Sequence, residues 1–173
     1  NLEGPLTHAD HAPVAKKYLY RSPPEKVAPA LLNAGFNVVS LANNHAMDQG
    51  AEGLRHTLDA LDLVGIKHTG AGMNLAEARK PALLESKGAR VAFLAYTLTF
   101  PEEFWATPDR PGSPFGHEAQ VRADIAAAKS QADIVLVSFH WGQEGKTELR
   151  DYQRSLGRAA IDAGAAAVIG HHP

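Results

Sequence analysis

The chain has 173 residues, 45% of them hydrophobic, and this length suits one compact domain with a buried core. The formal net charge is -2 with histidine neutral, so no basic field is present to bind nucleic acid or an anionic membrane surface. The absence of cysteine excludes disulfides, thiolate zinc sites and a cysteine nucleophile. No apolar run approaches the roughly 20 residues of a membrane span, and the first ten residues lack the pattern of a signal peptide.

Apolar runs alternate with amphipathic stretches along the first half of the chain. A helix is predicted over residues 23–34, because prolines begin it, apolar residues follow at helical spacing and a glycine closes it. Residues 36–42 predict a buried strand. Residues 51–64 predict a second helix with one leucine-rich face, and residues 91–96 predict another buried strand.

The segment of residues 101–116 interrupts this alternation. It contains four prolines together with Phe104 and Trp105, which indicates a loop. Because the loop follows the strand at 91–96, we expect it to cover or border a functional site, as a lid would.

The second half of the chain returns to alternating elements. Helices are predicted over residues 119–132 and 149–163, and strands over residues 133–139 and 165–169. Such alternation indicates an α/β fold in which helices cover a layered sheet. Both ends look cut, because nothing precedes NLEGP to hold it and the chain stops just after an apolar run, so we expect a fragment of a longer protein.

Polar residues follow three of the predicted strands: NNH at 43–45, HWG at 140–142 and HH at 171–172. The carboxyl ends of strands in an open α/β sheet meet at one edge, so these segments could converge although they lie far apart in the sequence. Glu3 would join them if a strand preceded it.

Nine histidines require sorting before any of them is assigned a role. His140 ends an apolar strand, and its alternative interpretation is a hydrogen-bonded core histidine. His45 and the pair at 171–172 have loop hydrogen bonding and a solvated turn as their alternatives. All three of these positions follow a predicted strand, and this shared placement is the evidence for a functional role. The remaining five lie without a chemical pattern: His8, His11, His56, His68 and His117.

Histidine nitrogen, asparagine oxygen and carboxylate together suit divalent zinc, manganese or iron. A site with several such ligands can hold two cations about 3.5–4 Å apart, which activate a water molecule and polarise the oxygen under attack. This chemistry is that of a hydrolase.

Five blocks carry a family resemblance: NLEGPLT (1–7), SLANNHAMDQG (40–50), GAGMNLAEARKP (70–81), FHWGQE (139–144) and GHHP (170–173). In this order they resemble the successive motifs of the CapA family of bacterial capsule and poly-gamma-glutamate synthesis proteins. That family is similar to calcineurin-like metallophosphoesterases. The resemblance spans essentially the whole chain and implies a metallophosphoesterase-like layered sheet flanked by helices.

The resemblance implies a role for each matching residue. Asn44 and His140 would be metal ligands, and Glu3 would be the acidic ligand. His45 would be the adjacent catalytic histidine that donates a proton to the leaving group.

The family's last histidine motif usually reads GHxH. Here it reads GHHP, so His171 or His172 would be the metal ligand at this position. Asp48, Trp141 and Glu144 closely follow or belong to the NNH and HWG motifs. They are expected to support the metal ligands or to contact the substrate.

Two departures from the family pattern affect the expected metal content and substrate. The aspartate block that opens the family's motifs would precede Asn1, so two cations are expected in the intact protein and fewer in this fragment. Glutamate stands at position 3 where calcineurin-like phosphoesterases carry aspartate. The substrate class therefore stays open between a phosphoester and an amide of polyglutamate.

These observations are compatible with two functions from different classes. A scaffold that binds no metal is a third alternative. The first is a metal-dependent hydrolase of capsule or poly-gamma-glutamate synthesis, located at the cell envelope or extracellular face, with capsule synthesis membrane proteins as possible partners. The second is a non-catalytic accessory protein that binds an anionic polymer in the same cleft. Lys16, Lys17 and Arg21 could supply a basic lining for that polymer, although solvated loop charges are the more ordinary explanation.

Overall fold

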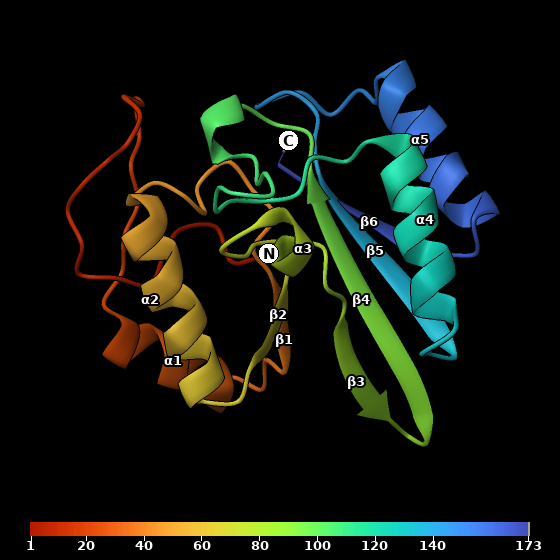
Figure 1. Cartoon of the computed structure of the whole chain (residues 1–173), viewed down its shortest axis with the longest axis horizontal. Helices are drawn as coiled ribbons and strands as arrows, with labels where there is room; N and C mark the ends of the chain where they lie inside the picture. Colours follow the sequence, from red (N-terminus) through yellow and green to blue (C-terminus); the bar gives the residue numbers. More distant parts are fainter. Residues whose placement is uncertain (173) are drawn as a thin grey trace.

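The computed structural model describes residues 1–172, which form two β-sheets with helices on their outer sides (Figure 1). The smaller sheet pairs β1 (Val38–Ser40) with β2 (Lys67–Thr69) in parallel. Helices α1 (Pro24–Asn33) and α2 (Gly50–Leu63) cover it on the left of Figure 1.

The larger sheet has four strands in the order β3-β4-β5-β6. Strand β4 pairs antiparallel with β3, whereas β4, β5 and β6 run parallel to one another. Because the three parallel strands point the same way, their carboxyl ends lie at one edge of the sheet. The bounds are β3 (Ala82–Ser86), β4 (Ala89–Thr97), β5 (Ile134–His140) and β6 (Ala167–His171).

Helices α4 (Glu118–Lys129) and α5 (Asp151–Asp162) pack on the larger sheet, on the right of Figure 1. Their apolar faces and the sheet enclose one core cluster, which includes the fully buried Val137 and Ile125. A second core cluster lies between the smaller sheet, α1 and α2. Two short elements complete the fold: α3 (Leu75–Ala78) and a 3-10 turn, η1 (Glu102–Phe104).

Glycine at position 70 allows the two sheets to approach each other. A Cβ atom built on Gly70 would lie 2.7 Å from Cβ of Ala42 and 2.8 Å from Cβ of Ala95, distances that real Cβ atoms essentially never show. Gly70 also has a φ of +86°, a conformation that favours glycine. The glycine therefore lets the end of β2 pack directly between the chain after β1 and the end of β4.

The α/β class and the helix-covered layers predicted from the sequence are confirmed, and the predicted long elements occur with small shifts at their ends. One expectation was wrong, and three short elements were not predicted. The strand predicted over 36–42 is only three residues long, and it belongs to a separate sheet. The short elements β2, β3 and α3 were missed, because they are too brief to show a periodic apolar pattern.

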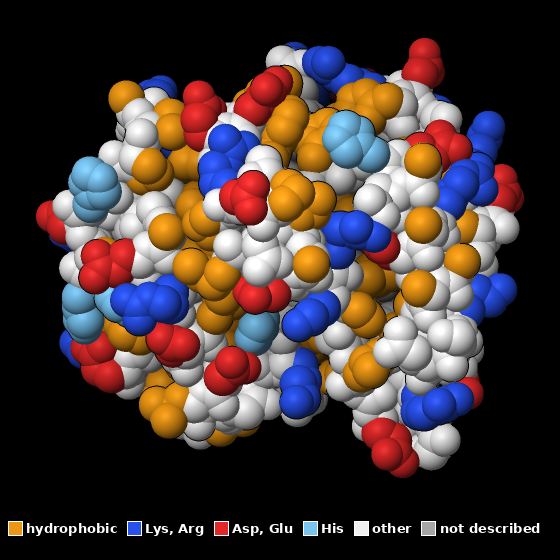
Figure 2. Space-filling view, viewed as in Figure 1, with side chains coloured by type: hydrophobic (Ala, Val, Ile, Leu, Met, Phe, Trp, Pro, Cys, Tyr) orange, Lys and Arg blue, Asp and Glu red, His pale blue; other side chains and the backbone are white. Residues whose placement is uncertain are grey.

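The surface shows mixed charge on the face seen in Figure 2, where acidic and basic side chains lie interspersed. No helix within residues 1–172 has the length and apolar character needed to cross a membrane.

Candidate metal centre and catalytic pair

The register of the larger sheet brings the ends of its parallel strands to one level. Thr97 of β4 pairs with His140 of β5, and His140 pairs in turn with His171 of β6. The chain after β1 approaches this edge from the other sheet. There Ser113, on the loop after β4, donates a hydrogen bond to the Leu41 carbonyl.

Four side chains meet at this edge. Nε2 of His140 lies 2.8 Å from Oδ1 of Asn44 and 3.7 Å from Oε1 of Glu3. One ligand atom each from Glu3, His140 and His172 lies within 4.8 Å of the others. We call Glu3, Asn44, His140 and His172 the metal cluster.

One of the last two histidines joins this cluster, and its backbone is unusual. His172 has a φ of 105°, in the left-handed region that residues with a Cβ rarely adopt. Its ring lies with its centroid 4.6 Å from that of His140. Within the described residues the cluster includes His172 and leaves His171 outside, although His171 is the register partner of His140.

The environment of His140 keeps its imidazole neutral. The side chain is buried, and burial lowers its pKa to about 3, with the positive charge that His172, His171 and His45 can carry adding to the effect. Its Nδ1 has no hydrogen-bond partner among residues 1–172, while Nε2 faces Asn44 and Glu3. A neutral imidazole with a free lone pair is the form that binds metal ions.

The donor atoms of the cluster fit a divalent cation. A carboxylate, an amide oxygen and two imidazoles form a mixed nitrogen and oxygen set, which zinc, manganese and iron accept. Nε2 of His140 is the ring nitrogen that faces Asn44 and Glu3, so this atom would bind the cation. These residues are therefore suited to hold a metal ion.

Next to the cluster, His45 and Asp48 form a buried pair. Nδ1 of His45 lies 2.6 Å from Oδ2 of Asp48, and the Asp48 side chain is fully buried. The backbone amide of Tyr20 donates a second hydrogen bond to the same oxygen, and the Tyr20 ring packs on His45 at 4.2 Å between centroids. The buried Asp48 carboxylate is therefore placed to orient His45, the supporting one of the two roles expected for it.

A pocket of about 640 Å³ opens beside the metal cluster, with Asn44 and His172 in its wall. Glu144 also lines it, as expected for a residue near the ligands. The other prominent lining residues are Leu98, Thr99, Phe100, Arg150 and Tyr152. A space of this size suits a substrate fragment bound next to the metal ligands.

Trp141 was expected to contact the substrate or to support the metal ligands, and the structure places its side chain in the core. Its side chain is buried, stacks on Phe139 at 4.6 Å between ring centroids, and forms part of the core under α5. The reason is strand alternation, because Trp141 points to the opposite face from His140.

The loop of residues 101–116 lies at the site's edge, where Phe115 bridges to Thr97. Phe104 is buried in the core with the residues of the smaller sheet, and Nε1 of Trp105 donates to the Thr99 carbonyl. These contacts tie the loop to the core, so it borders the site as one of the two expectations had it. Among the described residues it does not line the pocket, which residues 98–100 line instead.

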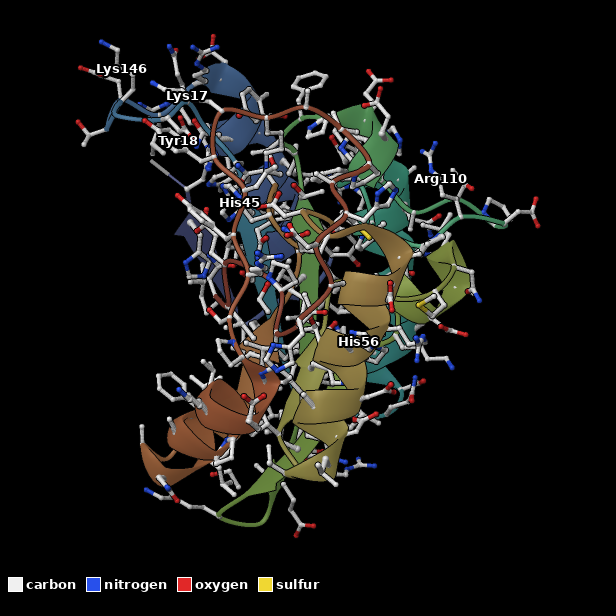
Figure 3. All side chains as sticks on the ribbon, turned by 90° about the vertical axis from the view of Figure 1, so that its left-hand side faces the viewer. Lys17, Tyr18, His45, His56, Arg110 and Lys146 are labelled. Atoms are coloured by element: carbon white, nitrogen blue, oxygen red, sulfur yellow. The ribbon has the colours of Figure 1, made fainter. Side chains whose placement is uncertain are left out.

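The basic lining proposed for a polymer is also not formed as expected. The ammonium group of Lys16 turns inward to Asp48 at 2.7 Å, and Arg21 pairs with Asp10 at 2.6 Å. Lys17 lies over the ring of Tyr18 at the outside of the molecule, whereas His45 lies among the ribbons (Figure 3).

Several site residues escaped the sequence analysis. Arg150 and Tyr152 stand at the start of α5, in a stretch that the sequence marks only as a helix end. Tyr20 lies in an irregular segment without a motif. Lys16, in the same segment, was considered only as a basic lining for a polymer, and its contact with Asp48 was not expected.

The two-sheet architecture is a metallophosphoesterase-like fold. A crystal structure described as a 5'-nucleotidase from Staphylococcus aureus, in complex with alpha-ketoglutarate, aligns with a TM-score of 0.60 at 16% sequence identity. The alignment covers 86% of this chain and 31% of that chain. At this identity the likeness concerns the fold alone.

The chain belongs to the family described as bacterial capsule synthesis protein PGA_cap, whose model matches residues 1–173. It is 36% identical to the PGA biosynthesis protein CapA of Bacillus subtilis and 35% identical to the capsule biosynthesis protein CapA of Bacillus anthracis. A polyglutamine synthesis accessory protein of Mycobacterium tuberculosis is also 35% identical. Each alignment covers 100% of this chain but 46%, 44% and 49% of the three relatives, so the chain spans about half their length. The resemblance to the CapA family is thereby confirmed.

Proposed function

We propose that this chain carries the metal-dependent hydrolase site of a capsule or poly-gamma-glutamate synthesis protein, acting on a phosphoester or a polyglutamate amide. The observation that carries the proposal is the meeting of four metal-type donors next to a buried histidine and carboxylate pair. A binding surface for a polymer could use a cation in the cluster, but it would not need a carboxylate oriented on His45.

In this proposal Glu3, Asn44, His140 and His172 hold a divalent cation, whose chemistry is to activate water and polarise the bond under attack. The family resemblance implies a second cation, held with an aspartate block that would precede Asn1. The site would face the cell envelope or the extracellular side.

His45 is the proposed proton donor to the leaving group. Nδ1 of His45 donates a hydrogen bond to Asp48 and keeps its proton, so Nε2 is the nitrogen that exchanges a proton with the substrate. The pocket beside the metal cluster would hold the substrate, with the guanidinium of Arg150 and the hydroxyl of Tyr152 as its polar contacts.

The second candidate is an accessory protein that binds an anionic polymer without turning it over. It is favoured by the Mycobacterium tuberculosis relative, which is named an accessory protein. Here Arg150 would contact the polymer's carboxylates, and a cation in the metal cluster would bridge to the polymer.

The test compares His45→Ala with the wild type in the full-length protein, on a phosphoester and on poly-gamma-glutamate. We expect the metal content to stay nearly unchanged and turnover to fall about 10²–10⁴-fold, the usual contribution of a positioned acid. Full activity of His45→Ala would remove the proposed proton donor. Polymer binding by metal-loaded protein that turns over neither substrate would make the accessory function the better account.

A further inference from the structure

The side chain of Lys16 is nearly enclosed by polar and aromatic partners. Its Nζ lies 2.7 Å from Oδ1 of Asp48, 3.2 Å from Nδ1 of His45, and within hydrogen-bond distance of the Asn44 carbonyl. The ring of Phe104 lies 5.2 Å away on another side. Only 15% of the Lys16 side chain is exposed, so these contacts replace water around a charged group.

The hydrogen bonds define where the proton of His45 lies. A carboxylate only accepts hydrogen bonds, so the 2.6 Å contact between Nδ1 of His45 and Oδ2 of Asp48 requires a proton on Nδ1. Lys16 then donates to Oδ1 of Asp48 and to the Asn44 carbonyl, and its approach to Nδ1 is a contact without a hydrogen bond. Each Asp48 oxygen thus has its own donors.

Lys16 belongs to an irregular segment that runs past the buried pair. Residues 7–21 contain no helix or strand. Two of their residues contact the pair directly: Lys16 through its ammonium group, and Tyr20 through its backbone amide on Asp48 and its ring on His45. Gln49 anchors the same segment elsewhere, at the backbone amide of His11 and the carbonyl of Tyr20.

We propose that Lys16 is a positioning residue for the proton donor. Its ammonium group fixes the Asp48 carboxylate on one side and the Asn44 carbonyl on the other, and so holds His45 in one orientation relative to the metal ligand Asn44. This role rests on the proposed function of His45. It would add to the site a residue that lies outside the motif at residues 40–50. Lys17, the next residue, makes no such contact and lies over Tyr18.

The first test observes His45 directly by histidine nitrogen NMR on chelator-treated protein. We expect the wild type to give a downfield Nδ1 proton signal that disappears in His45→Ala. Lys16→Met keeps the length of the side chain but removes its donors, and should shift or broaden this signal. Lys17→Met is the matched control and should leave it unchanged.

A second variant covers the case in which Lys16→Met does not fold. Lys16→Arg keeps the positive charge opposite Asp48. Its planar guanidinium is larger than the ammonium group, so it cannot donate to the Asp48 carboxylate and the Asn44 carbonyl in the same geometry. We expect it to fold, with the His45 signal still shifted. An unchanged signal in a folded Lys16 variant, an equal change in Lys17→Met, or no Nδ1 signal in the wild type would each overturn the proposal.

The second test measures kinetics on two phosphoesters, one with a 4-nitrophenol leaving group and one with an alkyl alcohol. For Lys16→Met we expect kcat to fall about 10- to 100-fold on the alkyl ester, as for a catalytic group displaced by about 1 Å, with little change in KM or metal content. The loss should be smaller on the nitrophenyl ester, because that group leaves without a proton. Equal losses on both esters would indicate a structural role and would contradict the proposal. If the wild type turns over neither ester, the NMR result still decides the role of Lys16.

Discussion

Nε2 of His140 and Oδ1 of Asn44 lie 2.8 Å apart, although 96 positions separate the two residues in the sequence. His140 ends β5 of the larger sheet, and Asn44 follows β1 of the smaller one. The two sheets therefore meet at this contact in the metal cluster.

Removing either partner should weaken metal binding. For Asn44→Ala and His140→Ala we expect the affinity for Zn²⁺ or Mn²⁺ to fall by at least about 10-fold, and any turnover to fall with it, because a ligand to the cation is lost. Titration calorimetry and elemental analysis measure the change. His56→Ala is the control, since His56 lies on α2 and bonds to Thr7. Wild-type affinity in both site variants would show that they are not ligands.

Substitutions of His171 and His172 should have different effects on metal affinity. His172→Ala should lose metal affinity, because His172 lies in the cluster, whereas His171→Ala should retain it. The same titration decides this, with both variants compared in one buffer. The reverse result would mean that the left-handed backbone at position 172 does not persist when metal binds.

Trp141 should matter for stability and little for binding. Trp141→Ala should lower the free energy of unfolding by about 3–5 kcal/mol, because it removes a large buried ring from the core. Urea unfolding measures this value. Trp141→Phe should retain most of the stability together with wild-type metal affinity. A metal-binding defect in folded Trp141→Phe would return Trp141 to the site.

Acid should destabilise the metal-free protein through His140. Its pKa is lowered to about 3 in the folded state from an ordinary value of 6.5, mainly by burial. Between these values the unfolded chain binds a proton that the folded protein does not, so the free energy of unfolding falls as the pH falls from 6.5 toward 3. One group contributes at most about 1.4 kcal/mol per pH unit.

The measurement is urea unfolding of chelator-treated protein at several pH values from 7 to 4. His140→Gln lacks the titrating ring and should show a shallower dependence on pH than the wild type. Identical slopes for the two proteins would mean that His140 does not carry the effect.

Much of the fold could be predicted from the sequence because it depends on neighbouring residues. Apolar spacing predicted α2 and α5 as well as β4 and β5, each within a few residues of its observed ends. The polar residues after the predicted strands also indicated Asn44 and His140 as site residues. These patterns are set by local periodicity and by the alternation of side chains along a strand.

Tertiary structure alone decided how those residues meet. Two sheets, joined where Gly70 permits close approach, bring Asn44 to His140. Within residues 1–172 the cluster includes His172 and leaves His171 outside, and the inward turn of Lys16 places a charge on Asp48. Each of these outcomes depends on contacts between segments far apart in the chain, which local propensity does not encode, because packing and the need to satisfy buried polar groups determine them only once the whole core has formed.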